Sequence, residues 1–106
     1  MTTIKSYTDT EQSKKLVKIL PIESADMYYW CGEELRIGGY KAMNIDYDIP
    51  CWSLAALLNV LPSATLDSSN DHHFRIHCMK RYTEWYDNAV DACVEMIIRL
   101  NESKLL

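Results

Sequence analysis

The sequence predicts a single α+β domain in which helices alternate with pairs of short strands. Three observations lead to this expectation: the length of 106 residues, a composition that is 48% hydrophobic and 25% charged, and an apolar spacing that switches between helical and strand periods. Few glycines and prolines interrupt the chain, which leaves little room for flexible linkers. We therefore expect one domain over residues 1–106, in the order α-β-β-α-β-β-α, with an antiparallel sheet and the helices packed on one face.

The N-terminal part of the chain predicts an arm followed by a helix. Residues 1–7 are expected to form a loose arm. Thr8 or Thr10 can then cap a helix that runs to about Leu20, with an acid in the capping-box position three residues after Thr8. Pro21 ends this helix because the residue before a proline disfavours the helical conformation.

Two strand pairs are predicted on either side of the middle of the chain. Aromatic density indicates a strand over 27–31, and 35–40 can return beside it after a turn at 32–34. A glycine pair should end the returning strand early or introduce a bulge. Residues 72–78 alternate between apolar and polar side chains, which is typical of a half-buried strand, and 82–86 can return beside them.

Between these pairs, Pro50 and Pro62 bracket a helix-forming run over residues 51–61 with only two plainly polar side chains. Proline suits the first turn of a helix and prevents its continuation at the other end. A helix that is apolar nearly all round must be covered on several sides. The following segment, 63–71, is rich in serine, aspartate and asparagine, and we expect it to be a loop.

The C-terminal segment predicts an amphipathic helix from about Ala89 to Ser103. Asp87 and Asn88 supply its N-cap, and Asp91 lies in the first turn, where the helix dipole favours a carboxylate. Its apolar side chains recur at helical spacing, so this helix should bury one face.

Charge and cysteine content argue against several classes of function. The net charge is −4 and the pI about 5.2, whereas nonspecific nucleic-acid binders usually carry a basic face. The basic cluster of Lys14, Lys15 and Lys18 is typical of a solvated helix face. The sequence shows no signal peptide, no run of about 18 apolar residues and no C-x-x-C pair. We therefore expect a cytoplasmic protein with reduced cysteines and no membrane partner.

The histidines form the first group with possible chemistry. His72, His73, His77 and Cys78 are metal-ligand residue types within a short segment. On a strand, however, side chains four residues apart are separated by about 13 Å, so His73 and His77 cannot share a metal ion there. A solvent-facing histidine row is the plainer interpretation. A small metal-binding or enzymatic domain using these histidines with a distant cysteine is the alternative.

Thiols and paired acids are the next candidates. Cys51 and Cys93 lie near expected helix starts, where the dipole can lower a thiol pKa, but Cys93 belongs to an apolar stripe that favours an inert thiol. Asp46 and Asp48 would lie about 6.6 Å apart on one face of an extended segment, near the separation found in paired-carboxylate hydrolases. A solvated acidic loop explains them more simply. The sequence therefore indicates no catalytic residue, cofactor or metal.

The aromatic side chains give the remaining functional signal, with seven tyrosines and three tryptophans. Helices cover only one sheet face in the expected fold, so some rings should lie on the other. Exposed tyrosine and tryptophan are favoured at protein interfaces and as stacking platforms for bases. Cross-strand pairs that only stabilise the sheet are the alternative. The candidate interaction surface, for a protein partner or a second copy of the chain, consists of Tyr28, Trp30, Tyr82, Trp85 and Tyr86.

Four segments together resemble a known group of proteins: residues 11–16, 23–27, 49–58 and 90–98. The group comprises small uncharacterised proteins of Bacteroides-type gut bacteria, often encoded beside prophage or other mobile-element genes. The resemblance implies a bacterial, cytosolic or phage-associated origin, and it implies no activity, ligand or catalytic residue. We therefore expect a non-catalytic accessory or protein-interaction domain, with weak nucleic-acid binding as a further alternative.

Overall fold

A computed structural model describes residues 5–106 and confirms the mixed α+β class and the approximate order of the elements. None of the helices in this range is long and apolar enough to cross a lipid bilayer. The elements are α1 (Thr10–Leu16), β1 (Met27–Trp30), β2 (Glu34–Ile37), β3 (Ile49–Cys51), α2 (Leu54–Val60), β4 (Thr65–Ser68), β5 (Phe74–Cys78), β6 (Arg81–Tyr82) and α3 (Ala89–Glu102), with short 3-10 turns at Ile22–Ser24 and Tyr40–Ala42.

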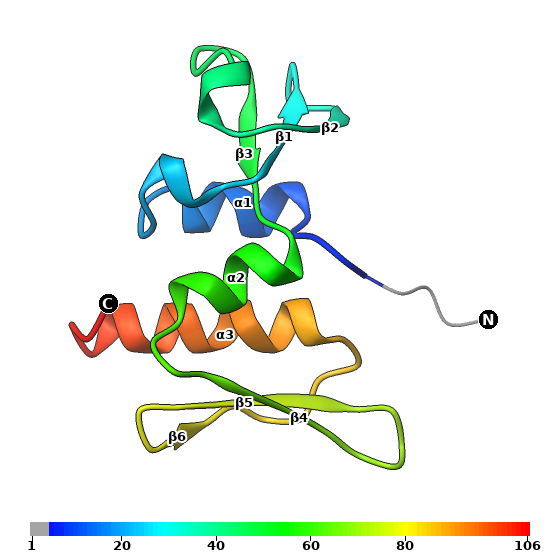
Figure 1. Cartoon of the computed structure of the whole chain (residues 1–106), viewed down its shortest axis with the longest axis vertical. Coiled ribbons are helices and arrows are strands. Elements are labelled where there is room, and N and C mark those ends of the chain that lie inside the picture. The colour runs from blue at the N-terminus through cyan, green and yellow to red at the C-terminus, as the bar shows by residue number, and fades with distance from the viewer. Residues whose placement is uncertain (1–4) are drawn as a thin grey trace.

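The strands form two antiparallel sheets of three strands each, in the orders β2-β1-β3 and β4-β5-β6. The sequence predicted the hairpins β1–β2 and β5–β6 within one sheet. Instead, two further strands, β3 and β4, each join one hairpin and complete a separate sheet. Figure 1 shows the helices stacked between the two sheets, with α3 lying along the second one. The outer face of the second sheet is left without a helix.

β3 occupies residues that were expected to begin the central helix. Pro50 pairs with Tyr28 in the register of β1 and β3, and β3 is an edge strand, where proline is tolerated. The helix begins only at Leu54, because the Ser53 hydroxyl accepts a hydrogen bond from the amide of Ala56 and acts as the N-cap. The predicted helix over 51–61 is therefore too long at its start.

The burial expected for this helix is also wrong in part. Leu57 is the one fully buried side chain of α2, while Ala55 and Asn59 are exposed. Cys51 and Trp52, which belonged to the predicted helix but precede the observed one, are as fully buried as Leu57.

β4 forms where a loop was predicted. Its four residues pair with β5 from Thr65 opposite His77 to Ser68 opposite Phe74. The remaining turn is short, and the Ser69 hydroxyl accepts hydrogen bonds from two amides within it. β6 is shorter than the predicted strand over 82–86, because the Thr83 hydroxyl takes the place of a backbone acceptor for the β5 amide of Ile76.

The start of the chain differs from the predicted arm and cap. Asp9, rather than Thr8 or Thr10, caps α1 through a reciprocal capping box with Gln12. Residues 5–7 are not loose: Ser6 accepts a hydrogen bond from the Leu54 amide, and Tyr7 forms a β-bridge with Ser53. The first four residues of the predicted arm lie outside the described range.

α3 confirms the prediction for the C-terminal helix and forms the centre of the core. Asn88 caps it by accepting a hydrogen bond from the Asp91 amide. α3 packs against α2 and β5. The core cluster also includes buried side chains from α1 and α2 and from the segment before α2; its largest members are Trp52, Leu16, Leu57, Ile76, Met96, Ile97 and Leu100.

The burial pattern of α2 predicts unequal effects for two neighbouring leucines. Leu57→Ala should lower the free energy of unfolding by about 3 kcal/mol, because it empties a fully buried site, whereas Leu58→Ala should cost about 1 kcal/mol. Urea unfolding of both variants measures the difference. Equal losses would contradict the one-sided burial of α2.

Candidate functional site

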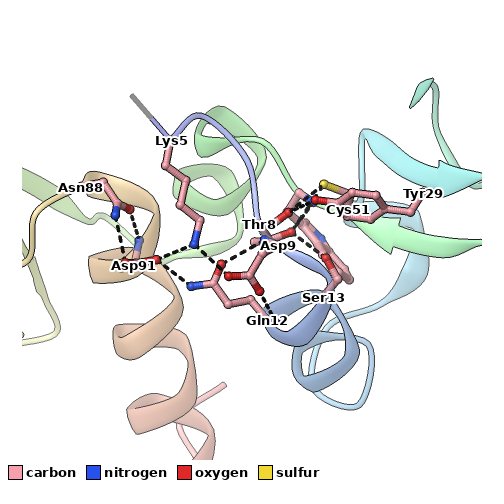
Figure 2. A network of polar contacts seen from close by, with 10 residues as sticks. Lys5, Thr8, Asp9, Gln12, Ser13, Tyr29, Cys51, Asn88 and Asp91 are labelled. Carbon is pink, nitrogen blue, oxygen red and sulfur yellow. Dashed lines mark hydrogen bonds and ion pairs between the residues drawn. The ribbon is translucent and has the colours of Figure 1, made fainter. Parts of the chain in front are cut away.

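Buried hydroxyl and thiol groups meet where the N-terminal segment reaches β1 and β3, as Figure 2 shows. The hydroxyls of Thr8 and Ser13 lie 2.8 Å apart. The Thr8 hydroxyl oxygen accepts a hydrogen bond from the Trp52 amide at 3.1 Å. The Thr8 backbone carbonyl accepts one from the Tyr29 hydroxyl at 2.6 Å. Cys51 Sγ lies 3.4 Å from the same carbonyl. Serine, threonine and cysteine are the residue types that serve as nucleophiles in enzymes, so this cluster is a candidate for chemistry.

The surroundings of this cluster favour a structural role. Burial raises the pKa of the Cys51 thiol and of the Tyr29 hydroxyl, so both groups are protonated at neutral pH. Within residues 5–106, neither a histidine nor a carboxylate donates to or accepts from Thr8, Ser13 or Cys51 through its side chain. Every buried side-chain nitrogen and oxygen in that range has a hydrogen-bond partner. The cluster joins the N-terminal segment to the first sheet.

A second set of contacts fastens the same segment to α3 (Figure 2). Asp91 Oδ1 accepts hydrogen bonds from Lys5 Nζ at 2.8 Å and from Gln12 Nε2 at 2.7 Å, and Asp91 Oδ2 accepts one from Asn88 at 2.9 Å. Burial alone would raise the pKa of Asp91, but these three hydrogen bonds outweigh it and lower the pKa. Lys5 also bonds Asp9 at 3.1 Å. The carboxylate therefore couples α1, α3 and the N-terminal segment.

Burial also disfavours the thiolate form of Cys78 and Cys93. Burial raises the pKa of Cys93 to about 12, and burial also raises the pKa of Cys78, whose thiol donates to the Pro62 carbonyl. Cys31 is exposed, and all four cysteines are free. A thiol that stays protonated at neutral pH is a weak nucleophile.

The predicted histidine group is spread over different surroundings. His72 lies in a turn with a φ of 61°, His73 Nε2 is 3.4 Å from Asp87 Oδ1, and His77 stacks on Tyr82. Across the described chain, no three side chains of histidine, cysteine, aspartate or glutamate are grouped closely enough to hold a metal ion. The geometry therefore gives the metal-binding alternative no support in residues 5–106.

The extended segment on which a pair of Asp46 and Asp48 would depend is not present, because the chain turns at residues 45–47. The Asp48 carboxylate accepts hydrogen bonds from the amides of Cys31 and Asn44, each at 2.8 Å. It thus ties the β1–β2 turn to the segment before β3. Asp46 is exposed to solvent.

The outer face of the second sheet carries an ordered row of side chains. The guanidinium carbon of Arg75 lies 4.4 Å from the ring centroid of Tyr82 and 4.6 Å from that of Trp85. The imidazole ring of His77 also stacks on Tyr82, with the ring centroids 4.2 Å apart and the ring planes inclined by 10°. Asp67 accepts a hydrogen bond from Arg75 Nε at 3.2 Å. We call these five residues the aromatic ladder.

The ladder is held in place and yet remains open to solvent. Cation–π contacts at exposed sites are worth about 0.5–1 kcal/mol each, so Arg75 favours the observed orientations of both neighbouring rings. Tyr82 is still 50% exposed and Trp85 45% exposed. Tyr82 and Trp85 thus make defined contacts with Arg75 without being buried.

The structure divides the aromatic surface that the sequence predicted. Tyr82 and Trp85 lie together, whereas Trp30 is on the first sheet beneath the guanidinium of Arg36. Tyr86 is half-buried and packs against the core.

Tyr28 does not belong to an exposed surface: its side chain is buried, so this part of the prediction is wrong. The segment at residues 38–42 covers it, since a Cβ atom on Gly38 would meet both the Tyr28 ring and Ala42. Arg75, His77 and Asp67 are not part of the surface that the sequence predicted. The alternation over 72–78 places Arg75 and His77 on the solvent face, and that signal could have identified them.

The hydrogen bonds of Thr8 predict a large loss of stability when this residue is replaced by valine, which has nearly the same volume. Thr8→Val should lower the free energy of unfolding by about 1–3 kcal/mol, because the buried Trp52 amide and Ser13 hydroxyl lose their partner. Thermal or urea unfolding measures this loss. Thr65→Val is the matched control, since Thr65 is exposed on a strand, and it should change the stability by less than about 0.5 kcal/mol.

The lowered pKa of Asp91 predicts a specific dependence of stability on pH. Asp91→Asn should cost about 1–2 kcal/mol near neutral pH, because the carboxylate loses charge-assisted hydrogen bonds. A carboxylate with a lowered folded-state pKa stabilises the protein above its unfolded pKa of about 3.9, and the stabilisation disappears as pH falls through the folded pKa. The difference in free energy of unfolding between the wild type and Asp91→Asn should therefore shrink at acidic pH.

Unfolding curves between about pH 7 and pH 2.5 measure this difference. Asp71→Asn, in an exposed turn, is the control and should follow the wild type at every pH. A difference between wild type and Asp91→Asn that is the same at all pH values would disprove the ionic contribution.

Comparisons with known proteins do not supply a function. No protein-family model, curated protein or solved structure matches the chain. The function is therefore inferred from the side chains and their geometry.

Proposed function

We propose that the chain is a non-catalytic interaction domain, an accessory protein of a bacterial mobile element, that binds a protein partner through the aromatic ladder. The observation that carries the proposal is the guanidinium of Arg75 held between the exposed rings of Tyr82 and Trp85. Tryptophan, tyrosine and arginine are the residue types that dominate the energetics of protein interfaces. The mobile-element origin rests on the sequence resemblance.

Order in the unbound state supports this role. Association has to fix side chains that were free to rotate, at about 0.5–1.5 kcal/mol for each flexible side chain. In the ladder, Asp67 already fixes Arg75 on one side, and Arg75 and His77 together fix Tyr82. A partner therefore meets side chains that already favour one arrangement, which reduces the cost of fixing them.

A protein is a better occupant than a nucleic acid on grounds of charge. Phosphate binding depends on cationic side chains that are available to the backbone. The carboxylate of Asp67 is 3.2 Å from Arg75 Nε and offsets the charge of the ladder, and the whole chain has a net charge of −4. The rings themselves remain exposed for apolar contact.

The test begins with a photo-crosslinking residue at Thr65, which is exposed and pairs with His77 beside the ladder. A protein captured from Bacteroides-type cells is purified, and its affinity is measured for the wild type and for two variants. Trp85→Ala should weaken binding by at least about tenfold. Trp30→Ala is the matched control, because Trp30 is equally exposed at 45% but lies on the other sheet, and it should bind like the wild type.

Equal effects of the two tryptophan variants would contradict the ladder as the contact surface. Tight, salt-sensitive binding of a single-stranded oligonucleotide that Trp85→Ala abolishes would replace the protein partner by a nucleic acid. Circular dichroism and thermal unfolding confirm that each variant is folded.

A further inference from the structure

A groove of about 580 Å³ lies between α1 and the segment 43–50, away from the aromatic ladder. Its walls are largely apolar and include Val17, the C-cap of α1, and Ile45 and Ile49 from the opposite side. Lys14 of α1 and Lys18, in the turn that follows the helix, line the same side of the groove. The groove therefore combines an apolar interior with a cationic rim.

The charges at the rim are available to a ligand. Lys14 approaches Glu11 only at 3.9 Å, with both side chains exposed, and such surface pairs contribute little. Lys18 has no ion-pair partner in the described part of the chain. The one acid in the lining, Asp48, already accepts hydrogen bonds from two backbone amides. The groove thus favours an anionic group attached to apolar side chains.

The segment beside the groove has this chemistry. Ile45 is 72% exposed and Tyr47 is 67% exposed; only Ile37, at 87%, exceeds them among the large apolar side chains that the structure describes. Asp46, between them, is exposed, and within residues 5–106 its carboxylate takes part in no hydrogen bond or ion pair, although its amide donates to Asn44 Oδ1. Exposed apolar side chains gathered in this way mark interaction sites. We call residues 45–47 the acidic knob.

We propose that two copies of the chain associate about a two-fold axis through this face, with the acidic knob of each copy in the groove of the other. A two-fold interface requires one continuous surface that carries both halves of every contact. The groove and the acidic knob meet this requirement because Ile45 belongs to both. In the dimer, Asp46 of each copy lies beside Lys14 and Lys18 of the other.

The contact is made by side chains rather than by strand addition. Pro50 lines the groove within the edge strand β3 and has no amide hydrogen to donate to an incoming strand. The dimer uses a different face from the aromatic ladder, so it leaves the proposed partner surface open. The two proposals can therefore fail independently.

Sedimentation of the full chain up to about 1 mM tests the dimer. The wild type should form dimers whose dissociation constant rises with salt. Lys14→Glu with Lys18→Glu, and separately Asp46→Lys, should each raise the dissociation constant at least about tenfold, because like charges then face each other. Mixing these two variants should restore a heterodimer, since each contact then joins opposite charges.

Lys15→Glu is the matched control, because Lys15 is exposed on the same helix but does not line the groove, and it should dimerise like the wild type. Three outcomes would each overturn the proposal: a monomer at every concentration, a failure of the mixture to associate, or a dimer that Trp85→Ala abolishes. A dimer that dissociates in the charge variants but persists in Trp85→Ala supports the groove whether or not the ladder binds a partner.

Discussion

The hydrogen bonds of Thr8 are the constraint on which the arrangement of the two halves depends. The core cluster gathers around α3 and includes no residue of β1, β2 or β3 among those described. The first sheet is instead joined through polar groups: the Thr8 carbonyl accepts from Tyr29 of β1, and its hydroxyl and amide bond the backbone of Trp52, directly after β3. A buried threonine with every polar atom paired makes these bonds strong and their loss costly.

The N-terminal segment, residues 5–9, therefore acts as a strap that joins two halves of the molecule: the first sheet, and the core cluster around α3 with the second sheet. At one end it meets the first sheet through Thr8, and at the other it reaches α3 through Lys5 and Asp91. The molecule measures 39 × 38 × 18 Å, so it is thin in one direction and has little depth for a second core. The aromatic ladder lies on the half held by the core, and the groove lies on the half held by the strap. Each surface can be occupied without covering the other.

Local signals made α3 and β5 predictable, whereas β3 and β4 depend on distant partners. The Asn88 cap and the alternation around Ile76 each involve only residues that are close together in the sequence. β4 has one aliphatic side chain, Leu66, and becomes a strand only because β5 is opposite it. Pro50 suits a helix start equally well, until its pairing with β1 is known. The same holds for the aromatic ladder. The solvent-facing residues of β5 were predictable from the local alternation, but Asp67 could not be assigned to the ladder without the pairing of β4 with β5.

Sheet stabilisation alone does not account for the aromatic ladder. It explains the stack of His77 on Tyr82, which are cross-strand partners in β5 and β6. It does not explain Trp85, which lies beyond β6 and remains 45% exposed. The connection to α3 is already fastened by Tyr86, which exchanges two backbone hydrogen bonds with Phe74 and packs against the core. The fold therefore does not require the exposed area of Trp85 to stay uncovered, and burial of that area is the gain that the proposed partner would offer.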